Sequence, residues 1–365
     1  MEMTAEHKPQ KESLLRKVIG LSMRFLIPLA ITVVLVWYMF TKIDFAQLWH
    51  TVRHGVDYKW IILAMVISVF SHIFRAMRWR LQLNATGIRP PLMQLTVSIF
   101  GTYALNLVFP RLGEVWRCTY ISQQQRASLT TVLGTMVADR LADTIMVFLL
   151  LLLTLLVANS QITTFLDKYP IGKGVIELFS DPKTWAAIIA ILLILWVIWR
   201  FLGKTKIVRG IAAKVAQIWQ GFAIVTRMKG RGRFLLLTIA IWGCYFLQLY
   251  TAFFAFQCTL THCFGEGTCF GLVSCLVAFV LSSIGMAIPS NGGLGPWNMA
   301  VVFGLMLYGV GEADAASMSI VVWSAQTLML IILGIYTAIY ISAGKKHDKE
   351  GESALAEAIE QEETL

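Results

Sequence analysis

Charged residues are scarce in this sequence of 365 residues. Asp, Glu, Lys and Arg together make up 14% of the chain, whereas hydrophobic residues make up 57%. A soluble domain usually carries about 25% charged residues, because they keep its surface hydrated. The composition therefore excludes a soluble fold and predicts an all-α polytopic integral membrane protein.

Several motifs are missing as well. No GxxxxGK[ST] sequence occurs, so nothing indicates ATP hydrolysis. The six cysteines form no CxxC pair and have no accompanying His cluster, so we expect no metal site and no cofactor. The first apolar run, 21–40, is long enough to span a bilayer and lacks the small-residue exit of a cleavable signal peptide.

Acids are outnumbered, since 31 Lys and Arg residues face 21 Asp and Glu residues, for a net charge of +10. The basic residues lie in loops between apolar segments, which indicates membrane topology and contact with anionic lipid rather than nucleic acid. They gather before the first span, at 78–89, at 200–233 and at 345–349. The positive-inside rule places these four regions, and both termini, on the cytoplasmic side.

Candidate spans need about 20 apolar residues. They are 21–40, 60–77, 129–158, 185–202, 234–260 and 317–342. Arg75, Arg78 and Arg80 close the second span, where we expect their side chains to snorkel to the membrane surface. We divide the chain into a cytoplasmic segment 1–20, a first membrane repeat 21–158, an extracytoplasmic connection 159–184, a second repeat 185–342 and a cytoplasmic acidic tail 343–365, which we expect to be poorly ordered. Within the second repeat, the basic amphipathic loop 203–233 either lies on the anionic inner leaflet or packs on the bundle.

Two further apolar regions are broken in the same way. Residues 107–113 (Leu-Val-Phe-Pro-Arg-Leu-Gly) align with 286–292 (Met-Ala-Ile-Pro-Ser-Asn-Gly), and each is an apolar helix stopped at a Pro-x-x-Gly turn. The two repeats enter the membrane from opposite sides and would therefore be inverted. Gly/Pro-interrupted segments at matching positions indicate a transporter site. Backbone freed at such a turn cannot face lipid, so we favour re-entrant hairpins over full spans, although topology alone leaves both open.

Ionisable residues occur where a bilayer tolerates few. Glu114 and Arg117 share a helix face, as do Asp139 and Asp143, and Arg140 lies three residues before Asp143. With Arg111, three Arg face three acids, which form either a closed buried network or a site that lends one Arg to a phosphate. The candidate substrate- or lipid-binding residues are Asn106, Arg111, Glu114, Arg117, Asp139, Arg140, Asp143, Asn291, Gly292, Gly293, Asn298 and Gln326, and the hinge or turn residues are Pro110, Gly113, Pro289, Gly295 and Pro296.

These motifs resemble the lysylphosphatidylglycerol synthase transmembrane family, a flippase-like membrane domain that also occurs as stand-alone bacterial proteins. The resemblance covers about residues 15–345 and rests on Asn106…Pro-Arg-Leu-Gly-Glu…Arg117, on Asp-Arg-x-x-Asp at 139–143 and on Pro-x-x-Gly-Gly-x-Gly at 289–295. It implies lipid translocation in the bacterial cytoplasmic (inner) membrane.

Two departures limit what the resemblance implies. Asn291 and Asn298 stand where the family usually has a second proline and an acid, so a role for that acid does not carry over. Only about twenty residues follow the last span, in place of the soluble aminoacyl-transferase domain of bifunctional members.

We therefore expect a non-enzymatic, flippase-like transporter that moves an anionic or modified lipid, or a lipid-linked intermediate, between leaflets. The alternatives are an intramembrane enzyme of lipid or lipid-linked sugar metabolism and an accessory scaffold for a separate lipid-modifying enzyme. Expected partners are membrane phospholipids or a lipid-linked substrate, and anionic inner-leaflet lipid at loop 203–233. A separate lipid-modifying enzyme and a second copy of this chain, in a homo-oligomer, are further candidate partners.

Overall fold

The computed structural model describes residues 45–109, 111–158, 228–265, 268–288 and 290–363, and five single positions between 182 and 193. Most residues of these stretches are helical, and the stretches contain no strand. The protein is thus an all-α polytopic membrane protein, as its composition predicts. The predicted spans 21–40 and 185–202 fall outside the described stretches, apart from those single positions, and so do most of loop 203–233, Pro110 and Pro289.

Four helices are long and apolar enough to cross a membrane. They are α3 (Tyr58–Ala85), α6 (Leu129–Val157), α11 (Arg231–Phe253) and α15 (Glu312–Glu363), whose apolar part is Glu312–Gly344. At 1.5 Å per residue, even α11 with its 23 residues reaches about 35 Å, more than the ~30 Å hydrocarbon core. Four of the six predicted spans are therefore present as helices. The backbone of α15 is helical as far as Glu363, and residues 352–363 are rich in the helix formers Ala and Glu.

One predicted boundary is wrong. The sequence predicts a single span over 234–260, but α11 ends at Phe253 and a separate short helix, α12 (Gln257–Cys263), follows. The Thr259 hydroxyl donates hydrogen bonds to the carbonyls of Phe253 and Phe256 at the break, and each carbonyl also accepts a backbone amide. No Gly or Pro occurs at this turn, so the apolar pattern of the sequence does not predict the end of α11.

Short helices separate the long ones in two matching runs. Between α3 and α6 lie α4 (Leu92–Val108) and α5 (Leu112–Gln124). Between α11 and α15, after α12, lie α13 (Leu272–Gly285), the 3-10 turn η1 (Asn291–Gly293) and α14 (Pro296–Met306). Each short pair forms a hairpin, α4 against α5 and α13 against α14. The longest of these helices, α4 with 17 residues, reaches only about 26 Å.

Small residues allow the helices within each hairpin to approach closely. A Cβ added at Gly113 would lie 2.1 Å from the Thr102 carbonyl oxygen of α4. In the second hairpin, a Cβ at Gly304 would lie 2.7 Å from the Ala278 Cα. Both hairpins therefore depend on backbone-to-backbone packing that any side chain would disrupt.

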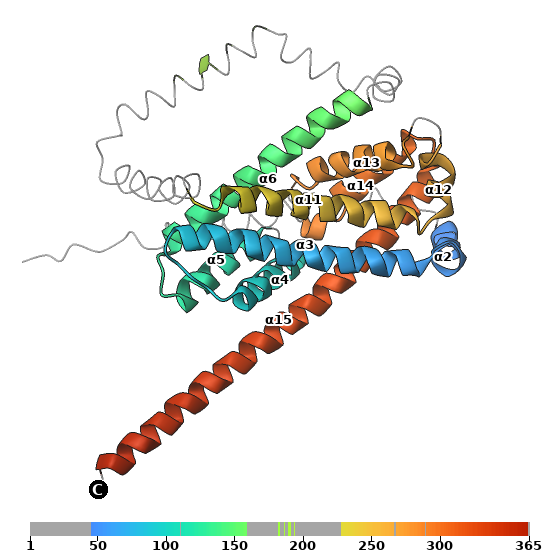
Figure 1. Cartoon of the computed structure of the whole chain (residues 1–365). Helices are drawn as coiled ribbons and strands as arrows, with labels where there is room; N and C mark the ends of the chain where they lie inside the picture. The colour runs from blue at the N-terminus through green and yellow to red at the C-terminus, as the bar shows by residue number, and fades with distance from the viewer. Residues whose placement is uncertain are drawn as a thin grey trace, which may run out of the picture.

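Helices α3 and α11 lie side by side at the centre of the bundle (Figure 1). They run antiparallel, because the Asp57 amide before α3 donates to the Ala255 carbonyl after α11 at 3.0 Å. At this end, α2 (Phe45–His54) and α12 lie together (Figure 1). Apolar side chains of α3, α11, α13, α14 and α15 form the largest core cluster.

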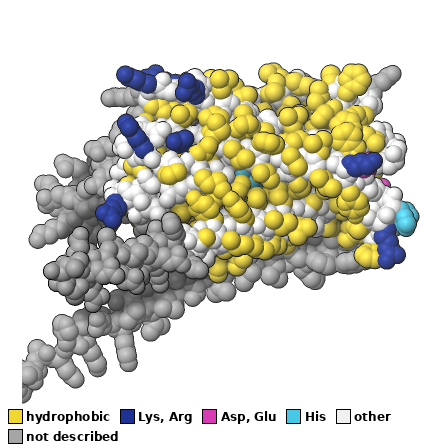
Figure 2. Space-filling model, turned by 60° about the horizontal axis from the view of Figure 1, so that its bottom comes forward, with side chains coloured by type: hydrophobic (Ala, Val, Ile, Leu, Met, Phe, Trp, Pro, Cys, Tyr) yellow, Lys and Arg dark blue, Asp and Glu magenta, His cyan; other side chains and the backbone are white. Residues whose placement is uncertain are grey.

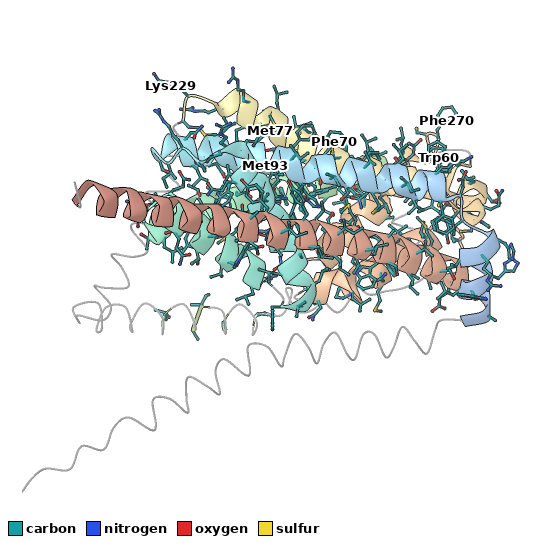
Figure 3. The ribbon with its side chains drawn as sticks, turned by 90° about the horizontal axis from the view of Figure 1, so that it is seen from below. Trp60, Phe70, Met77, Met93, Lys229 and Phe270 are labelled. Atoms are coloured by element: carbon teal, nitrogen blue, oxygen red, sulfur yellow. The ribbon has the colours of Figure 1, made fainter. Side chains whose placement is uncertain are left out.

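The outer surface is apolar. Figure 2 shows one face on which hydrophobic side chains fill the middle and Lys and Arg side chains gather toward two opposite ends. In Figure 3, Lys229 lies at one end of the bundle and Trp60 and Phe270 at the other, with the exposed Phe70 and Met77 between them. This belt is the surface expected of a protein surrounded by lipid.

Candidate functional site

The tips of the two hairpins contact each other at exposed positions. The Arg111 Nη2 atom, at the first tip, donates a hydrogen bond to the Ala287 carbonyl of the second tip at 2.7 Å. In return, the Asn291 Nδ2 atom donates to the Val108 carbonyl of the first tip at 3.0 Å. The two broken segments that the sequence aligns with each other are therefore in direct contact.

The first tip has an unusual backbone. Arg111 caps α5 in the left-handed region, with φ of 62°. A non-glycine residue held in this region costs about 1–3 kcal/mol and is typical of functional turns. The Asn106 Oδ1 atom accepts a hydrogen bond from the Gly113 amide at 2.9 Å and so satisfies one open donor of α5. Asn106 thus holds the turn that presents Arg111.

The second tip is built on three glycines with positive φ, namely Gly292, Gly293 and Gly295. The Gly292 carbonyl accepts a hydrogen bond from Trp323 Nε1 of α15 at 3.0 Å. A Cβ at Gly292 would lie 2.6 Å from Leu107 Cδ2, so a side chain here would push the tips apart. Glycine is needed at this position for both the backbone angle and the contact.

Two predicted binding residues have structural partners instead of facing the tips. Asn298 is fully buried, and its Oδ1 accepts from the Gly295 amide at 3.2 Å while its Nδ2 donates to the Ser319 carbonyl at 3.1 Å. It joins the start of α14, where Pro296 is the first residue, to α15. Gln326 of α15 donates to Ser68 Oγ at 3.2 Å and accepts from Gln248 at 2.6 Å.

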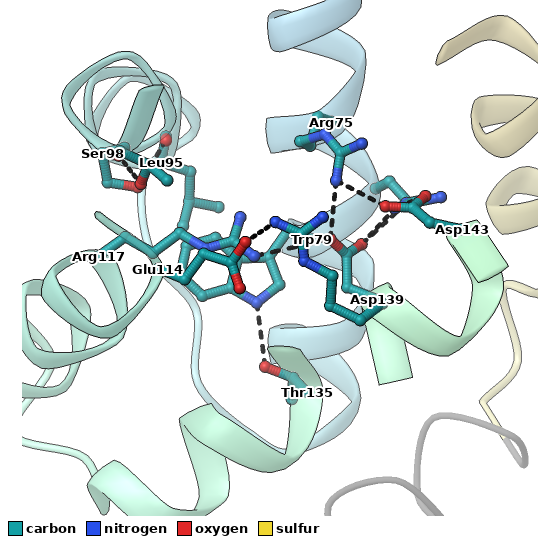
Figure 4. Close-up of polar contacts among 12 residues, drawn as sticks. Arg75, Trp79, Leu95, Ser98, Glu114, Arg117, Thr135, Asp139 and Asp143 are labelled. Carbon is teal, nitrogen blue, oxygen red and sulfur yellow. Dashed lines mark hydrogen bonds and ion pairs between the residues drawn. The ribbon is translucent and has the colours of Figure 1, made fainter. Parts of the chain in front are cut away.

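Seven charged side chains form what we call the charge cluster. Its members are Arg75 and Arg78 of α3, Glu114 and Arg117 of α5, and Asp139, Arg140 and Asp143 of α6. Figure 4 shows the carboxylates of Asp139 and Asp143 turned toward the helix that carries Arg75.

Asp139 and Asp143 are held by the two arginines of α3. Arg75 Nη1 lies 3.3 Å from Asp139 and 2.9 Å from Asp143, and Arg78 Nη2 lies 2.7 Å and 2.8 Å from the same two carboxylates. Arg78 Nη1 also donates to Thr238 Oγ1 of α11 at 3.2 Å. All four charged residues are less than 9% exposed. Such short contacts are needed to offset the desolvation of buried charges.

The predicted snorkelling of Arg75 and Arg78 is therefore wrong. Their residues are 4% and 0% exposed, and they point into the bundle. Their three-residue spacing on one face of α3 was the available signal, because two arginines facing the same direction at membrane depth need acids opposite them. Arg80, by contrast, is exposed.

Glu114 and Arg117 share a face of α5 and could pair, but each has its ion-pair partner on α6. Glu114 of α5 pairs with Arg140 of α6, whose side chain is 45% exposed. Arg117 is 1% exposed, and its nearest acid oxygen is Asp139 Oδ2 at 3.7 Å. The guanidinium of Arg117 lies over the Trp79 ring at 4.6 Å. Helical spacing identifies residues that share a face, but the opposite helix supplies the partner.

Two tyrosines and one histidine that are not among the predicted site residues lie next to the charge cluster. The Tyr245 hydroxyl accepts hydrogen bonds from Arg75 Nε at 3.3 Å and Nη2 at 3.2 Å, and it lies 3.3 Å from the Tyr103 hydroxyl. The His72 ring packs against the Tyr103 ring at a tilt of 35° with centroids 4.4 Å apart, and neither of its buried ring nitrogens has a hydrogen-bond partner among the described residues. These residues extend the polar interior from the charge cluster toward Gln326. No sequence motif marks them, since tyrosines in apolar helices usually pack.

In the described part of the chain, no group of three or more His, Cys, Asp or Glu residues could hold a metal ion. The cysteines there, which include Cys263 and Cys269, are all free thiols. The chemistry that this site offers is therefore hydrogen bonding and charge: buried guanidinium groups, carboxylates and the open backbone of two helix tips.

Comparison with known proteins gives one match. The family model for the lysylphosphatidylglycerol synthase TM region matches residues 25–334. No curated protein and no solved structure matches the chain. The matched residues include both hairpins, the charge cluster and all four long helices as far as residue 334 of α15. The chain therefore belongs to the family of the lysylphosphatidylglycerol synthase transmembrane region.

Proposed function

We propose that this protein is a flippase-like transporter, which moves an anionic or modified lipid, or a lipid-linked intermediate, between the leaflets of a bacterial inner membrane. Family membership supports a lipid-related role in a membrane. The observation that carries the proposal is the contact between the two hairpin tips beside a buried charge cluster. The exposed polar tips and the buried charges next to them offer partners for a headgroup, while the acyl chains would stay in lipid.

We propose that both hairpins are re-entrant and enter from opposite sides. Four short helices support this, because none reaches across ~30 Å of hydrocarbon. Their tips carry backbone groups outside regular helix, which lipid cannot satisfy and which must be buried or line a cavity. The matching order of long and short helices in 58–157 and 231–344 supports two inverted repeats.

The charges of the described loops support the predicted orientation. Arg89, Arg126 and Lys229 flank the ends of α3, α5 and α11 that lie together, and Lys229 marks one end of the bundle in Figure 3. The opposite end carries both signs, with Asp57, Lys59 and Glu312 among its residues. The first end would thus be cytoplasmic, and α15 would place the C-terminus on that side.

In this mechanism the tips act as the gate. The helices α5 and α14 both begin at the tips, so their partly positive N-termini and the Arg111 guanidinium face the same place. An anionic headgroup would replace the Ala287 carbonyl as the partner of Arg111 and separate the two tips. Rocking of one hairpin against the other would then pass the headgroup from one leaflet to the other.

Leaflet exchange of labelled phospholipids in proteoliposomes tests the proposal. We expect exchange by the wild type and at least a roughly tenfold slower rate for Arg111→Asn, since a charge-assisted contact to phosphate is lost. Asn tolerates the left-handed backbone of this position, so strain in the turn does not account for the loss.

The matched control is Arg89→Asn, an exposed arginine in the α3–α4 loop, which should leave exchange unchanged. A folded wild type that exchanges none of several headgroup classes would contradict transport. It would favour an intramembrane enzyme or a scaffold for a separate enzyme.

A further inference from the structure

The charge cluster carries more positive than negative charge. Four guanidinium groups, those of Arg75, Arg78, Arg117 and Arg140, face three carboxylates, those of Glu114, Asp139 and Asp143. Arginine stays protonated in proteins, so among the residues that the structure describes the cluster keeps one positive charge in excess. A buried charge without a partner is costly, which makes a missing anion the physical question at this site.

The excess charge is located at Arg117. Arg75 and Arg78 each lie within 3.0 Å of at least one carboxylate, and Arg140 pairs with Glu114. Arg117 lies 3.7 Å from Asp139, whose oxygens already contact Arg75 and Arg78 at 3.3 Å and 2.7 Å. Two nitrogens of its guanidinium, Nε and Nη2, are buried and have no hydrogen-bond partner. Nη2 is the nitrogen that lies 3.7 Å from Asp139 Oδ2, too far for a hydrogen bond, so this 99% buried guanidinium keeps two N–H groups that could donate to the oxygen atoms of an anion.

The Trp79 ring and Glu114 lie close to Arg117. The Trp79 ring covers one face of the guanidinium at 4.6 Å, and Trp79 Nε1 is fixed by a 3.0 Å hydrogen bond to Thr135 Oγ1. Glu114 lies one helical turn before Arg117 on α5, as Figure 4 shows. Its partner Arg140 has a side chain that is 45% exposed, so the pair of Glu114 and Arg140 reaches the surface of the bundle.

We propose that Arg117 is the phosphate subsite of the transport path and that the charge cluster selects a phosphodiester with one net negative charge. This inference rests on the proposed function, because the phosphate would enter as part of a lipid headgroup. One negative charge neutralises the cluster. A zwitterionic headgroup would bring an ammonium group toward four arginines, and a second negative charge would lie against the buried Asp139.

Equilibrium binding to the purified full-length chain in detergent tests the subsite without requiring two leaflets. The probes are phosphatidylglycerol (one negative charge), phosphatidylethanolamine (zwitterionic), phosphatidic acid at a pH where it carries two charges, and glycerol phosphate. For the wild type, we expect phosphatidylglycerol to bind at least about tenfold tighter than phosphatidylethanolamine.

Charge substitutions should then shift this preference in opposite directions. Arg117→Met brings the cluster to neutrality and should remove the preference for phosphatidylglycerol. Glu114→Gln adds one positive charge to the balance and should make doubly charged phosphatidic acid the tightest ligand. Arg117→Lys keeps the charge without the planar pair of donors, so we expect weaker binding with the preference retained. The exposed Arg233→Met serves as the matched control and should bind like the wild type.

Each outcome bears on the subsite. Equal binding of phosphatidylglycerol and phosphatidylethanolamine by the wild type, or an unchanged preference in folded Arg117→Met, would overturn it. If Arg117→Met does not fold, the lipid preferences of Arg117→Lys and Glu114→Gln test the subsite in its place. Competition by glycerol phosphate at the concentrations at which lipid binds would support the phosphate subsite and assign it to a soluble ligand. Loss of selective binding with leaflet exchange intact would reject the subsite and leave transport standing.

Discussion

Asp139→Asn should lower the free energy of unfolding by about 3–5 kcal/mol, the cost of removing one partner from a buried ion pair. The substitution keeps the shape of the side chain and removes its charge. Asp139 lies within 4.0 Å of Arg75, Arg78 and Arg117 and is fully buried. An amide group would present its own N–H donors to these guanidinium groups, leaving Asp143 to face them almost alone.

The measurement is denaturant unfolding of the purified protein in mixed micelles. Asp57→Asn is the matched control, because Asp57 is exposed and caps α3 with one hydrogen bond to the Lys59 amide, a role that Asn fills equally well. We expect the control to unfold with the wild type. Coincident unfolding of the Asp139 and Asp57 variants would mean that the charge cluster does not hold α3 and α6 together.

Gly113→Ala adds one methyl group and should destabilise the first hairpin more than a methyl group added at any other position in it. A Cβ at this position would lie 2.1 Å from the Thr102 carbonyl oxygen and 2.9 Å from Asn106 Oδ1. Neither is the free end of a long side chain, so α4 and α5 would have to separate. We expect a loss of about 3 kcal/mol or failure to fold, at the upper end of what overpacking costs.

The control for this substitution is Gly243→Ala, in the interior of α11, where nothing lies within 4 Å of the added Cβ. Because alanine is the better helix former, this variant should be as stable as the wild type or more stable, by up to about 1 kcal/mol. Thermal unfolding of both variants in the same detergent compares them directly. A stable Gly113→Ala would show that the two helices of the hairpin are not packed backbone to backbone.

Composition and hydropathy alone predict the class of fold. Four of the predicted spans are long helices because an apolar run of about 20 residues has no other stable form in lipid. The Pro-x-x-Gly segments also locate both tips, with the second helix of each hairpin beginning at Leu112 and at Pro296. The repeat pattern does not predict the contact of Arg111 with Ala287. These residues are 176 positions apart, and only tertiary packing brings the two turns together.

The partners inside the charge cluster show the same limit. Spacing correctly groups Asp139 with Asp143, because that relation lies within one helix. It also puts Arg117 within reach of Glu114, whereas Glu114 pairs with Arg140 of the neighbouring α6. The sequence alone places Arg75 and Arg78 at the membrane surface, because it does not show that α6 packs against α3. Charge balance contains the missing information: two buried acids on one face of a span require cations on another helix.

The central claim is that headgroups pass between the two hairpin tips, and a reversible bridge across the tips tests it most directly. In a chain without its native cysteines, Val108→Cys and Asn291→Cys would replace two residues now joined by a 3.0 Å hydrogen bond. A short reducible thiol-specific cross-linker joins them, and phospholipid exchange is measured in the same proteoliposomes before bridging, after bridging and after reduction. We expect exchange to stop on bridging and to return on reduction, with either single-cysteine chain unaffected by the reagent. Exchange that continues at its original rate through fully bridged protein would contradict the account.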